Sequence, residues 1–168
     1  DKIREKLGGC RVKVDDSDKS PGWKFSEQEI LGIPTRIEIG PKDIENNQVI
    51  VCRRDTREKI TVSLDNIAVE LRNILETMQV DMYNKAKDFL ESHIYEAKTL
   101  DEMVNKFKTD RGLIKACWCG DPECEGEVKY LTGGAATRCL IEDEEMISDK
   151  CIWCGKPAKH MAYWGKSY

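Results

Sequence analysis

The sequence predicts an α/β (α+β) fold in which a mixed-sheet domain is joined by a long helix to a second, small αβ domain. Three observations predict this fold. Residues 1–64 contain short apolar–polar alternations separated by turn residues, residues 65–98 follow a helical period, and residues 99–168 combine both patterns around paired cysteines. A chain of 168 residues is long enough for two small domains.

In the first part, residues 2–7 are expected to form a short helix that ends at Gly8-Gly9. Cys10–Val14 alternates as a strand does, and polar turn residues follow it. A second short helix is expected over Trp23–Leu31. Three further strands are expected at Thr35–Ile39, Gln48–Arg53 and Lys59–Leu64.

From Asp65 onward the apolar residues recur at helical spacing. The pattern continues for about 30 residues, which corresponds to a helix of roughly 45 Å. We expect its apolar stripe to pack into a core rather than to bind a partner. The stripe consists of Leu71, Ile74, Leu75, Met78, Met82, Phe89 and Leu90.

Two helices and three strands are expected in the last part of the chain. Thr99 and Glu102 have the spacing of a capping box, so a helix is expected to begin there. Asp121 and Pro122 predict the N-cap and the first turn of a second helix. The strands are expected at Leu113–Ala116, Thr137–Ile141 and His160–Trp164.

Composition indicates a soluble globular protein, with 40% apolar and 35% charged residues. No stretch approaches the ~20 consecutive apolar residues that a membrane-spanning helix needs. The first residues, DKIREKLGG, are charged and lack the apolar region of a signal peptide. We therefore expect a cytoplasmic protein.

Four of the eight cysteines form two close pairs, Cys119 with Cys124 and Cys151 with Cys154. In a reducing compartment such pairs indicate a metal site more often than disulfides. Four thiolates complete the tetrahedral shell of a structural zinc ion and leave no open position for a substrate. Cys117 can replace Cys119 on spacing alone. Glycine follows both Cys119 and Cys154, however, and lets backbone N–H groups turn towards the thiolate, which favours Cys119.

Three other cysteines, Cys10, Cys52 and Cys139, lie in expected strands and are predicted to act as small hydrophobic residues. A catalytic zinc site of the deaminase type would need a His-x-Glu sequence, and neither His93 nor His160 begins one. The closed ligand set and the missing base together disfavour a metalloenzyme.

The segment from Ser20 to Asp43, SPGWKFSEQEILGIPTRIEIGPKD, combines aromatic rings, a forked cation and several carboxylates. These groups suit unpaired RNA bases, which are recognised by stacking and by hydrogen bonds to their edges. A solvated helix–strand corner is the alternative. The net charge of −4 argues against a generally basic surface, so RNA contacts are expected to be local. Nearby cations that support this interpretation are Arg53, Arg54, Arg57 and Lys59.

The order of residues in this segment resembles the anticodon-binding domain of prolyl-tRNA synthetases, of the type shared by archaea, eukaryotes and some bacteria. The last third resembles the zinc-binding C-terminal domain of the same family, through WCGDPEC, TRCLI, CIWCGKPAK and the final WGKSY. The two matches cover nearly the whole chain. They imply an anticodon-binding domain at residues 1–64, a connecting helix at residues 65–98 and a zinc-binding domain at residues 99–168.

Enzymes of this family attach proline to tRNA(Pro) with ATP and Mg²⁺, in a class II catalytic domain that precedes the anticodon-binding domain. No motif of that catalytic domain is visible in the sequence, and the anticodon-binding domain is expected to be incomplete at its N-terminus. The resemblance implies the C-terminal part of a proline–tRNA ligase, inactive by itself. Its implied partners are the tRNA(Pro) anticodon loop and the catalytic domain of the same parent chain, and the parent is expected to be a homodimer. The alternative is a free-standing zinc-binding interaction module without an RNA role.

The resemblance also implies roles for individual RNA-binding residues. Phe25 matches the aromatic residue on which an anticodon base stacks. Glu29, Arg36 and Asp43 match groups that contact base edges, and Lys59 matches a basic contact after the hairpin. Proline codons begin with two cytosines, so the anticodon ends in two guanines. An arginine fork fits guanine O6 and N7, while a carboxylate accepts from guanine N1–H and N2–H₂.

Two further residues have structural expectations. Trp23 is expected to pack against the domain rather than to bind RNA. Tyr168, the last residue, matches a terminal tyrosine whose carboxylate folds back toward the catalytic domain in this family.

Overall fold

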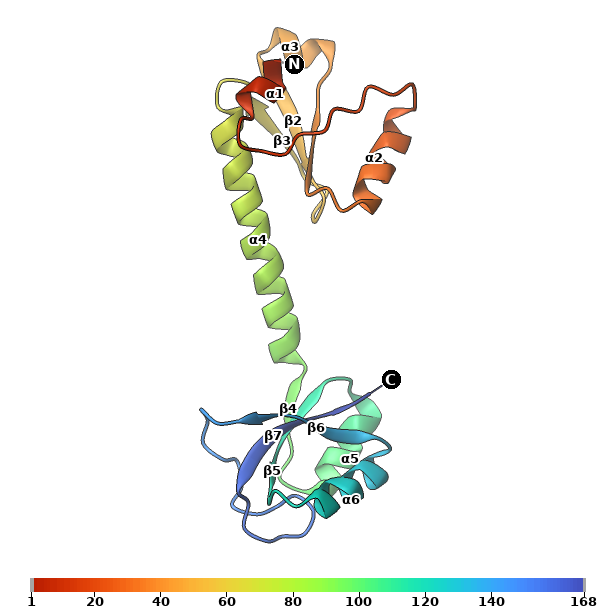
Figure 1. The fold of residues 1–168 in the computed structure, drawn as a ribbon, viewed down its shortest axis with the longest axis vertical. Helices are drawn as coiled ribbons and strands as arrows, with labels where there is room; N and C mark the ends of the chain where they lie inside the picture. The colour runs from red at the N-terminus through yellow and green to blue at the C-terminus, as the bar shows by residue number, and fades with distance from the viewer. Residues whose placement is uncertain (1, 168) are drawn as a thin grey trace. The chain divides into compact units, whose positions relative to one another are not determined.

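The computed structural model describes residues 2–167, so the expectation for Tyr168 lies outside the described residues. The chain divides into two compact units, Asp1–Lys85 and Ala86–Tyr168, each with its own hydrophobic core. Both units combine helices with strands, which confirms the predicted α/β fold class (Figure 1). Within residues 2–167, no helix is both long enough and apolar enough to cross a membrane.

The first unit is built on an antiparallel sheet with the strand order β1-β2-β3. The helix expected at Trp23–Leu31 begins two residues earlier, because Pro21 occupies its first turn and Ser20 its N-cap. The expected strands are confirmed to within one residue: β1 (Thr35–Glu38), β2 (Gln48–Arg53) and β3 (Lys59–Ser63). The helices are α1 (Lys2–Lys6), α2 (Pro21–Ile30), α3 (Pro41–Glu45) and the first part of α4 (Ile67–Ser92).

Two local expectations for this unit are wrong. Cys10–Val14 is not a strand, since none of the strands among residues 2–167 pairs with it. Cys10 and Val12 instead pack against the core from outside the sheet. Helix α3 is absent from the expected elements, although Pro41 in its first turn and the bond from Gly40 N to the Asp43 carboxylate both favour a helix start.

The two faces of the first sheet differ because side chains alternate along each strand. Val49 and Val51 of β2 face the core and the first turns of α4. The register pairs Arg36 with Cys52 and Cys52 with Lys59, so these three residues form a row on the opposite face. Helix α2 covers that opposite face (Figure 1). The buried core consists of Leu7, Val49, Val51, Val62, Ile67, Leu71, Ile74 and Met78.

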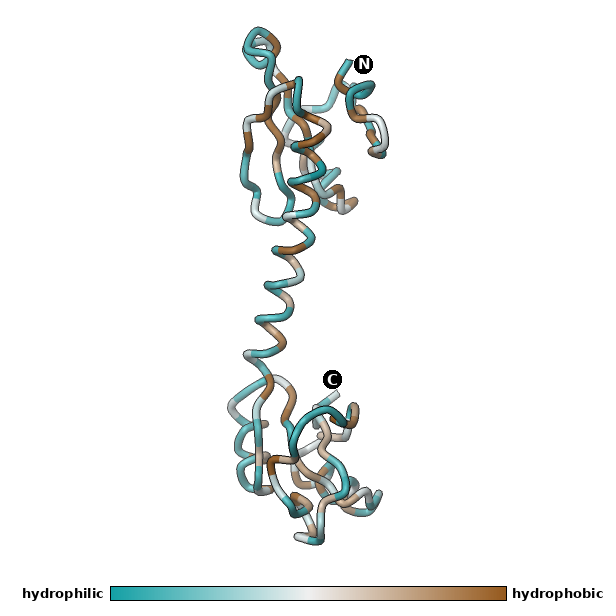
Figure 2. Tube along the Cα trace, turned by 90° about the vertical axis from the view of Figure 1, so that its left-hand side faces the viewer, coloured by the Kyte–Doolittle hydropathy of each residue, from teal (hydrophilic) through white to brown (hydrophobic). Residues whose placement is uncertain are grey.

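The apolar stripe of α4 is buried only in its first half. Leu71, Ile74 and Met78 are buried, and for them the prediction of core packing is confirmed. The prediction is wrong for the second half, because Met82, Phe89 and Leu90 are exposed by 48%, 67% and 52%. The reason is length: strands of five or six residues span about 20 Å, whereas a helix of 26 residues spans about 39 Å. Figure 2 shows the hydrophobic residues of α4 continuing beyond the strands of the first unit.

The second unit contains a four-stranded mixed sheet with the order β4-β5-β7-β6, in which β4 and β5 are parallel and the other pairs antiparallel. The expected strands and the two expected helices are confirmed. The connecting helix expected at residues 65–98 is too long, because α4 ends at Ser92 and residues 94–96 form β4, which pairs with β5. The strands are β4 (Ile94–Glu96), β5 (Leu113–Trp118), β6 (Ala135–Ile141) and β7 (His160–Lys166). The helices are α5 (Leu100–Thr109) and α6 (Pro122–Thr132).

The sequence signals at the helix starts of this unit act as predicted. Glu102 N donates to Thr99 Oγ1 at 3.3 Å, and the Glu102 carboxylate accepts from Thr99 N, which is the capping box. Asp121 accepts from the backbone N–H of Glu123 at 3.0 Å and caps α6. The core between helices and sheet consists of Ala97, Met103, Ile114, Ala116, Val128, Ile152, Ala162 and Trp164.

Candidate functional site

Three of the predicted RNA-contacting residues meet on the face of the first sheet that carries α2. Phe25 and Glu29 lie one turn apart on α2, and Arg36 projects from β1 towards them. The guanidinium carbon of Arg36 lies 4.1 Å from the centroid of the Phe25 ring, a cation–π contact. Arg36 Nη1 donates to Glu29 Oε1 at 2.8 Å. All three side chains are half-buried, and the pocket that they line with Cys52 has only about 10 Å³ of free volume.

Glu38 joins this group, although the sequence analysis assigns it no role. Its Oε1 accepts from Arg36 Nε at 2.8 Å, and its Oε2 accepts from Lys59 Nζ at 2.8 Å. Partial burial raises the pKa of Glu38, but the bonds from Lys59 and Arg36 outweigh it and hold that pKa below its ordinary value. Arg36 and Glu38 are two residues apart on one strand, so their shared face was readable from the alternation.

The four cations of residues 53–59 divide between two locations. Arg54 lines the small pocket, and the 80% exposed Arg57 lies 3.5 Å from Glu29 Oε2. Lys59 reaches the same group through Glu38. These three therefore belong to the face that carries Phe25.

Arg53 lies on the core face and is only 6% exposed. It donates to both oxygens of Asp55, at 3.0 and 2.7 Å, and its Nη2 donates to Asp81 Oδ2 of α4 at 2.7 Å. Its guanidinium thereby holds the β2–β3 turn against α4. Hydrogen bonding to Arg53 is also the main cause that lowers the pKa of Asp55.

Two residues of the Ser20–Asp43 segment stand apart from this group. Asp43 lies in α3, where its Oδ2 accepts from Gly40 N at 2.9 Å and its Oδ1 accepts from Gln48 Nε2 at 3.2 Å. Trp23 is 47% exposed, with Lys19 Nζ 5.4 Å from its ring, so the expectation that it packs into the domain is wrong.

The paired cysteines lie together in the second unit. The Sγ atoms of Cys119, Cys124, Cys151 and Cys154 all lie within 4.8 Å of one another. Cys119 Sγ is 3.6 Å from Cys124 Sγ and 3.8 Å from Cys154 Sγ. Tetrahedral zinc with Zn–S bonds of about 2.3 Å holds its sulfur ligands about 3.8 Å apart, so this donor set fits zinc. Cys117 lies within β5 and outside this group.

Local backbone geometry explains how the two pairs converge. Gly120 and Gly155, which follow one cysteine of each pair, have φ angles of +89° and +70°, the left-handed region that glycine favours. Burial disfavours the Cys151 thiolate, but N–H groups of Cys154 and Trp153 lower its pKa to about 7. Burial and the neighbouring thiols raise the pKa of Cys124.

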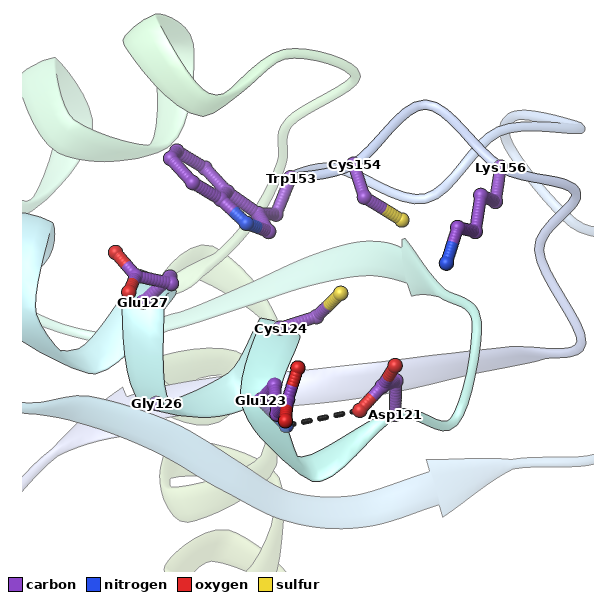
Figure 3. A pocket seen from close by; sticks show the side chains of 8 residues that line it. All are labelled: Asp121, Glu123, Cys124, Gly126, Glu127, Trp153, Cys154 and Lys156. Atoms are coloured by element: carbon purple, nitrogen blue, oxygen red, sulfur yellow. Dashed lines mark hydrogen bonds between the residues drawn. The ribbon is translucent and has the colours of Figure 1, made fainter.

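An open pocket of about 420 Å³ lies beside the cysteines. Figure 3 shows the sulfur atoms of Cys124 and Cys154 facing one another there, with Trp153 and Lys156 from the loop that carries Cys154. Gly126 and three acidic residues complete the lining; the acids are Asp121, Glu123 and Glu127.

The other three cysteines differ from one another. Cys52 is 2% exposed, and its predicted role as a small buried residue is confirmed. Cys10 is half-buried against the core without being in a strand. Cys139 lies in β6 as expected but is exposed, so the prediction that it acts as a small hydrophobic residue is wrong.

Comparison with known proteins assigns the family. Residues 1–74 match the anticodon binding domain family, and residues 100–168 match the family described as prolyl-tRNA synthetase, C-terminal. The proline–tRNA ligase of Lachnoclostridium phytofermentans is 54% identical over 166 residues, which are 99% of this chain and 35% of that protein. The chain belongs to the prolyl-tRNA synthetase family and matches the C-terminal region of its members. The resemblance read from the sequence is therefore confirmed.

A second member of the prolyl-tRNA synthetase family gives the same picture. The proline–tRNA ligase of Clostridium novyi is 50% identical over 169 residues, with 100% of this chain and 35% of that protein covered. The chain thus spans about a third of the length of these curated relatives.

Proposed function

We propose that this chain recognises the anticodon of tRNA(Pro) and forms the zinc-stabilised C-terminal region of a proline–tRNA ligase. The observation that carries the proposal is the grouping of Phe25, Glu29 and Arg36 on the sheet face opposite the core. The anticodon-binding family match and the names of the relatives support it. The domain boundaries predicted from the sequence, at residues 64 and 98, are part of the same proposal.

The chemistry of the three residues suits a guanine. The ring of Phe25 offers a stacking surface, and stacking on an aromatic residue contributes ~1–3 kcal/mol per base. The Arg36 fork can donate to O6 and N7, while the Glu29 carboxylate can accept from N1–H and N2–H₂. In the structure these groups are paired with each other. The side chains of Arg36 and Glu29 are 21% and 30% exposed, so a base can reach the pair and replace the pairing.

The remaining predicted contacts complete the proposed surface. Lys59 is 54% exposed at its side chain and is available to a backbone phosphate or a base edge. Asp43 keeps acceptor capacity beyond the two bonds that it makes within the protein, since a carboxylate accepts about four. It is proposed as a further base-edge contact, at a site separate from the Phe25 group.

The four paired cysteines are proposed to hold one structural zinc ion. Zinc would cross-link the end of β5 and the first turn of α6 to the loop that precedes β7, and a closed shell of four thiolates leaves no position for a substrate. In the parent enzyme we propose a class II catalytic domain that attaches proline with ATP and Mg²⁺, a homodimer, and a cytoplasmic location. The chain alone is proposed to be inactive in aminoacylation.

Binding to two anticodon stem-loops tests the RNA proposal. One loop carries an anticodon that ends in two guanines, and in the other both guanines are replaced by adenines. We expect the 168-residue chain to prefer the first loop by ~1–3 kcal/mol, because a good bidentate contact discriminates by that amount. Equal affinity for both loops would overturn the proposal.

A further inference from the structure

Glu38 lies between two of the proposed RNA contacts and binds both at once. Its two oxygens are used separately, Oε1 by Arg36 Nε and Oε2 by Lys59 Nζ, each at 2.8 Å. The Glu38 side chain is 21% exposed, as is that of Arg36. A carboxylate in this position neutralises one of two neighbouring cations and determines the directions in which both point.

The sheet register makes this bridge rigid. Arg36 and Lys59 lie two strands apart, on β1 and β3, and Cys52 of β2 is the partner of both. Cys52 is short and buried, so the long side chains can meet above the middle strand. Because Arg36 and Glu38 project from the same strand, their contact does not depend on the position of α2.

Glu29 holds Arg36 in a different way. It lies on α2 rather than on the sheet, and the partner of its second oxygen among residues 2–167 is the exposed Arg57, whose Nη2 is 3.5 Å away. Its contact with Arg36 therefore depends on the spacing between helix and sheet. Of the two carboxylates on the Arg36 fork, Glu29 is the one more easily exchanged for a base.

We propose that Glu38 is a positioning residue, which orients Arg36 and Lys59 for guanine recognition and stays bound to them, while Glu29 releases Arg36 and turns to the base. This inference rests on the proposed anticodon recognition. It assigns different roles to two acids that contact the same guanidinium: one remains within the protein and the other takes part in the readout.

Glu38→Gln is the sharpest test, because it changes the charge and keeps the shape. A glutamine amide has one acceptor oxygen and one NH₂ donor, so it cannot accept from both cations. We expect affinity for the loop that ends in two guanines to fall about tenfold, the lower end of the effect of losing one charged hydrogen bond. The preference over the adenine-substituted loop should fall with it.

The matched control is Glu27→Gln, the same charge change on α2. Glu27 is exposed, and its side chain makes no hydrogen bond or ion pair with any residue from 2 to 167. This variant should bind both loops within about twofold of the unchanged chain, since Glu27 is exposed and takes no part in the contacts of Phe25, Glu29 and Arg36. Melting temperatures of all variants are measured to establish that they are folded.

Combination with other substitutions separates positioning from a general structural role. If Glu38 acts through the two cations, Glu38→Gln should have a reduced effect in an Arg36→Ala background and no effect in an Arg36→Ala/Lys59→Ala background. Glu38→Asp, which keeps the charge but is too short to reach both cations, should recover part of the preference. Additive losses in every background would overturn the positioning role.

The outcomes for the two proposals are distinct. If the unchanged chain discriminates between the loops and Glu38→Gln binds as Glu27→Gln does, the positioning role is wrong and anticodon recognition stands. If the unchanged chain binds both loops equally, anticodon recognition itself is overturned, together with the inference that rests on it.

Discussion

The two candidate sites of this chain differ in how their charged groups are balanced. Around Arg36, the cations Arg36, Arg57 and Lys59 each have a carboxylate partner, and their side chains are between a fifth and four-fifths exposed. Around Cys151, four sulfur atoms converge and three of their residues are buried. We therefore propose different roles for the two sites: the first exchanges its internal pairs for an RNA base, and the second gains its stability from a metal ion.

Removal of the metal should have the largest effect. Structural zinc contributes ~10–16 kcal/mol of apparent binding free energy in small domains at pH 7, so a chelator should unfold the second unit and leave the first little changed. Thermal melting followed by circular dichroism, together with metal analysis, provides the test. Cys124→Ser should behave like chelation, and Cys139→Ser, which changes an exposed thiol, is the matched control. Protein that contains no metal and melts unchanged with chelator would contradict the metal proposal.

Arg53→Ala should produce the next largest effect, and it concerns the stability of the first unit. The substitution leaves Asp55 without its buried partner and frees the β2–β3 turn from α4. We expect the free energy of unfolding to fall by about 3 kcal/mol, the lower end of the range for breaking a buried pair, because Asp81 is half exposed. Urea denaturation measures this free energy. Arg54→Ala, next in the chain and exposed, should change stability by no more than about 0.5 kcal/mol.

Substitutions in the Phe25 group should alter RNA binding by smaller amounts and in two distinct ways. Phe25→Ala should weaken binding to both stem-loops by ~1–3 kcal/mol, since every base can stack on an aromatic ring. Arg36→Ala should weaken mainly the loop with two guanines, because its fork reads O6 and N7. Fluorescence anisotropy with both loops separates the two. A uniform loss from Arg36→Ala would assign it to phosphate rather than base contact.

The smallest expected effect is a pH dependence of the stability of the first unit. Hydrogen bonds from Arg53 lower the pKa of Asp55 in the folded state, so the folded form binds the proton less readily than the unfolded form. The stabilisation is complete above the unfolded pKa of about 3.9 and is lost as pH falls towards the lower folded value. Asp55→Asn should therefore flatten the loss of stability below about pH 4. The free energy of unfolding is measured by urea denaturation at several pH values. If it falls between neutral and acid pH as steeply in Asp55→Asn as in the unchanged chain, this contribution is ruled out.

Elements determined by local signals were predictable from the sequence. The capping box at Thr99 and the proline after Asp121 place helix starts correctly, because the hydrogen bonds that decide them lie within four residues. Pairing is less local. Cys10–Val14 alternates like a strand but finds no partner strand among the described residues, and the three-residue β4 exists only through parallel pairing with β5.

The candidate site was predictable to the extent that residue types and spacing determine it. The cysteine pairs were identifiable because ligand spacing is a local property. The separation of Arg53 from Arg54 and the part played by Glu38 depend on which face of the sheet each residue occupies, and hence on the register of β1, β2 and β3. The exposed second half of α4 depends on how far the neighbouring sheet extends, which periodicity does not reveal.

The most direct test of the central claim combines the two stem-loops with the unchanged chain and Arg36→Ala. The claim predicts that the unchanged chain prefers the loop with two guanines by ~1–3 kcal/mol, and that Arg36→Ala removes this preference while its melting temperature stays nearly constant. A chain that binds both loops equally, or a preference that survives the loss of Arg36, would contradict it.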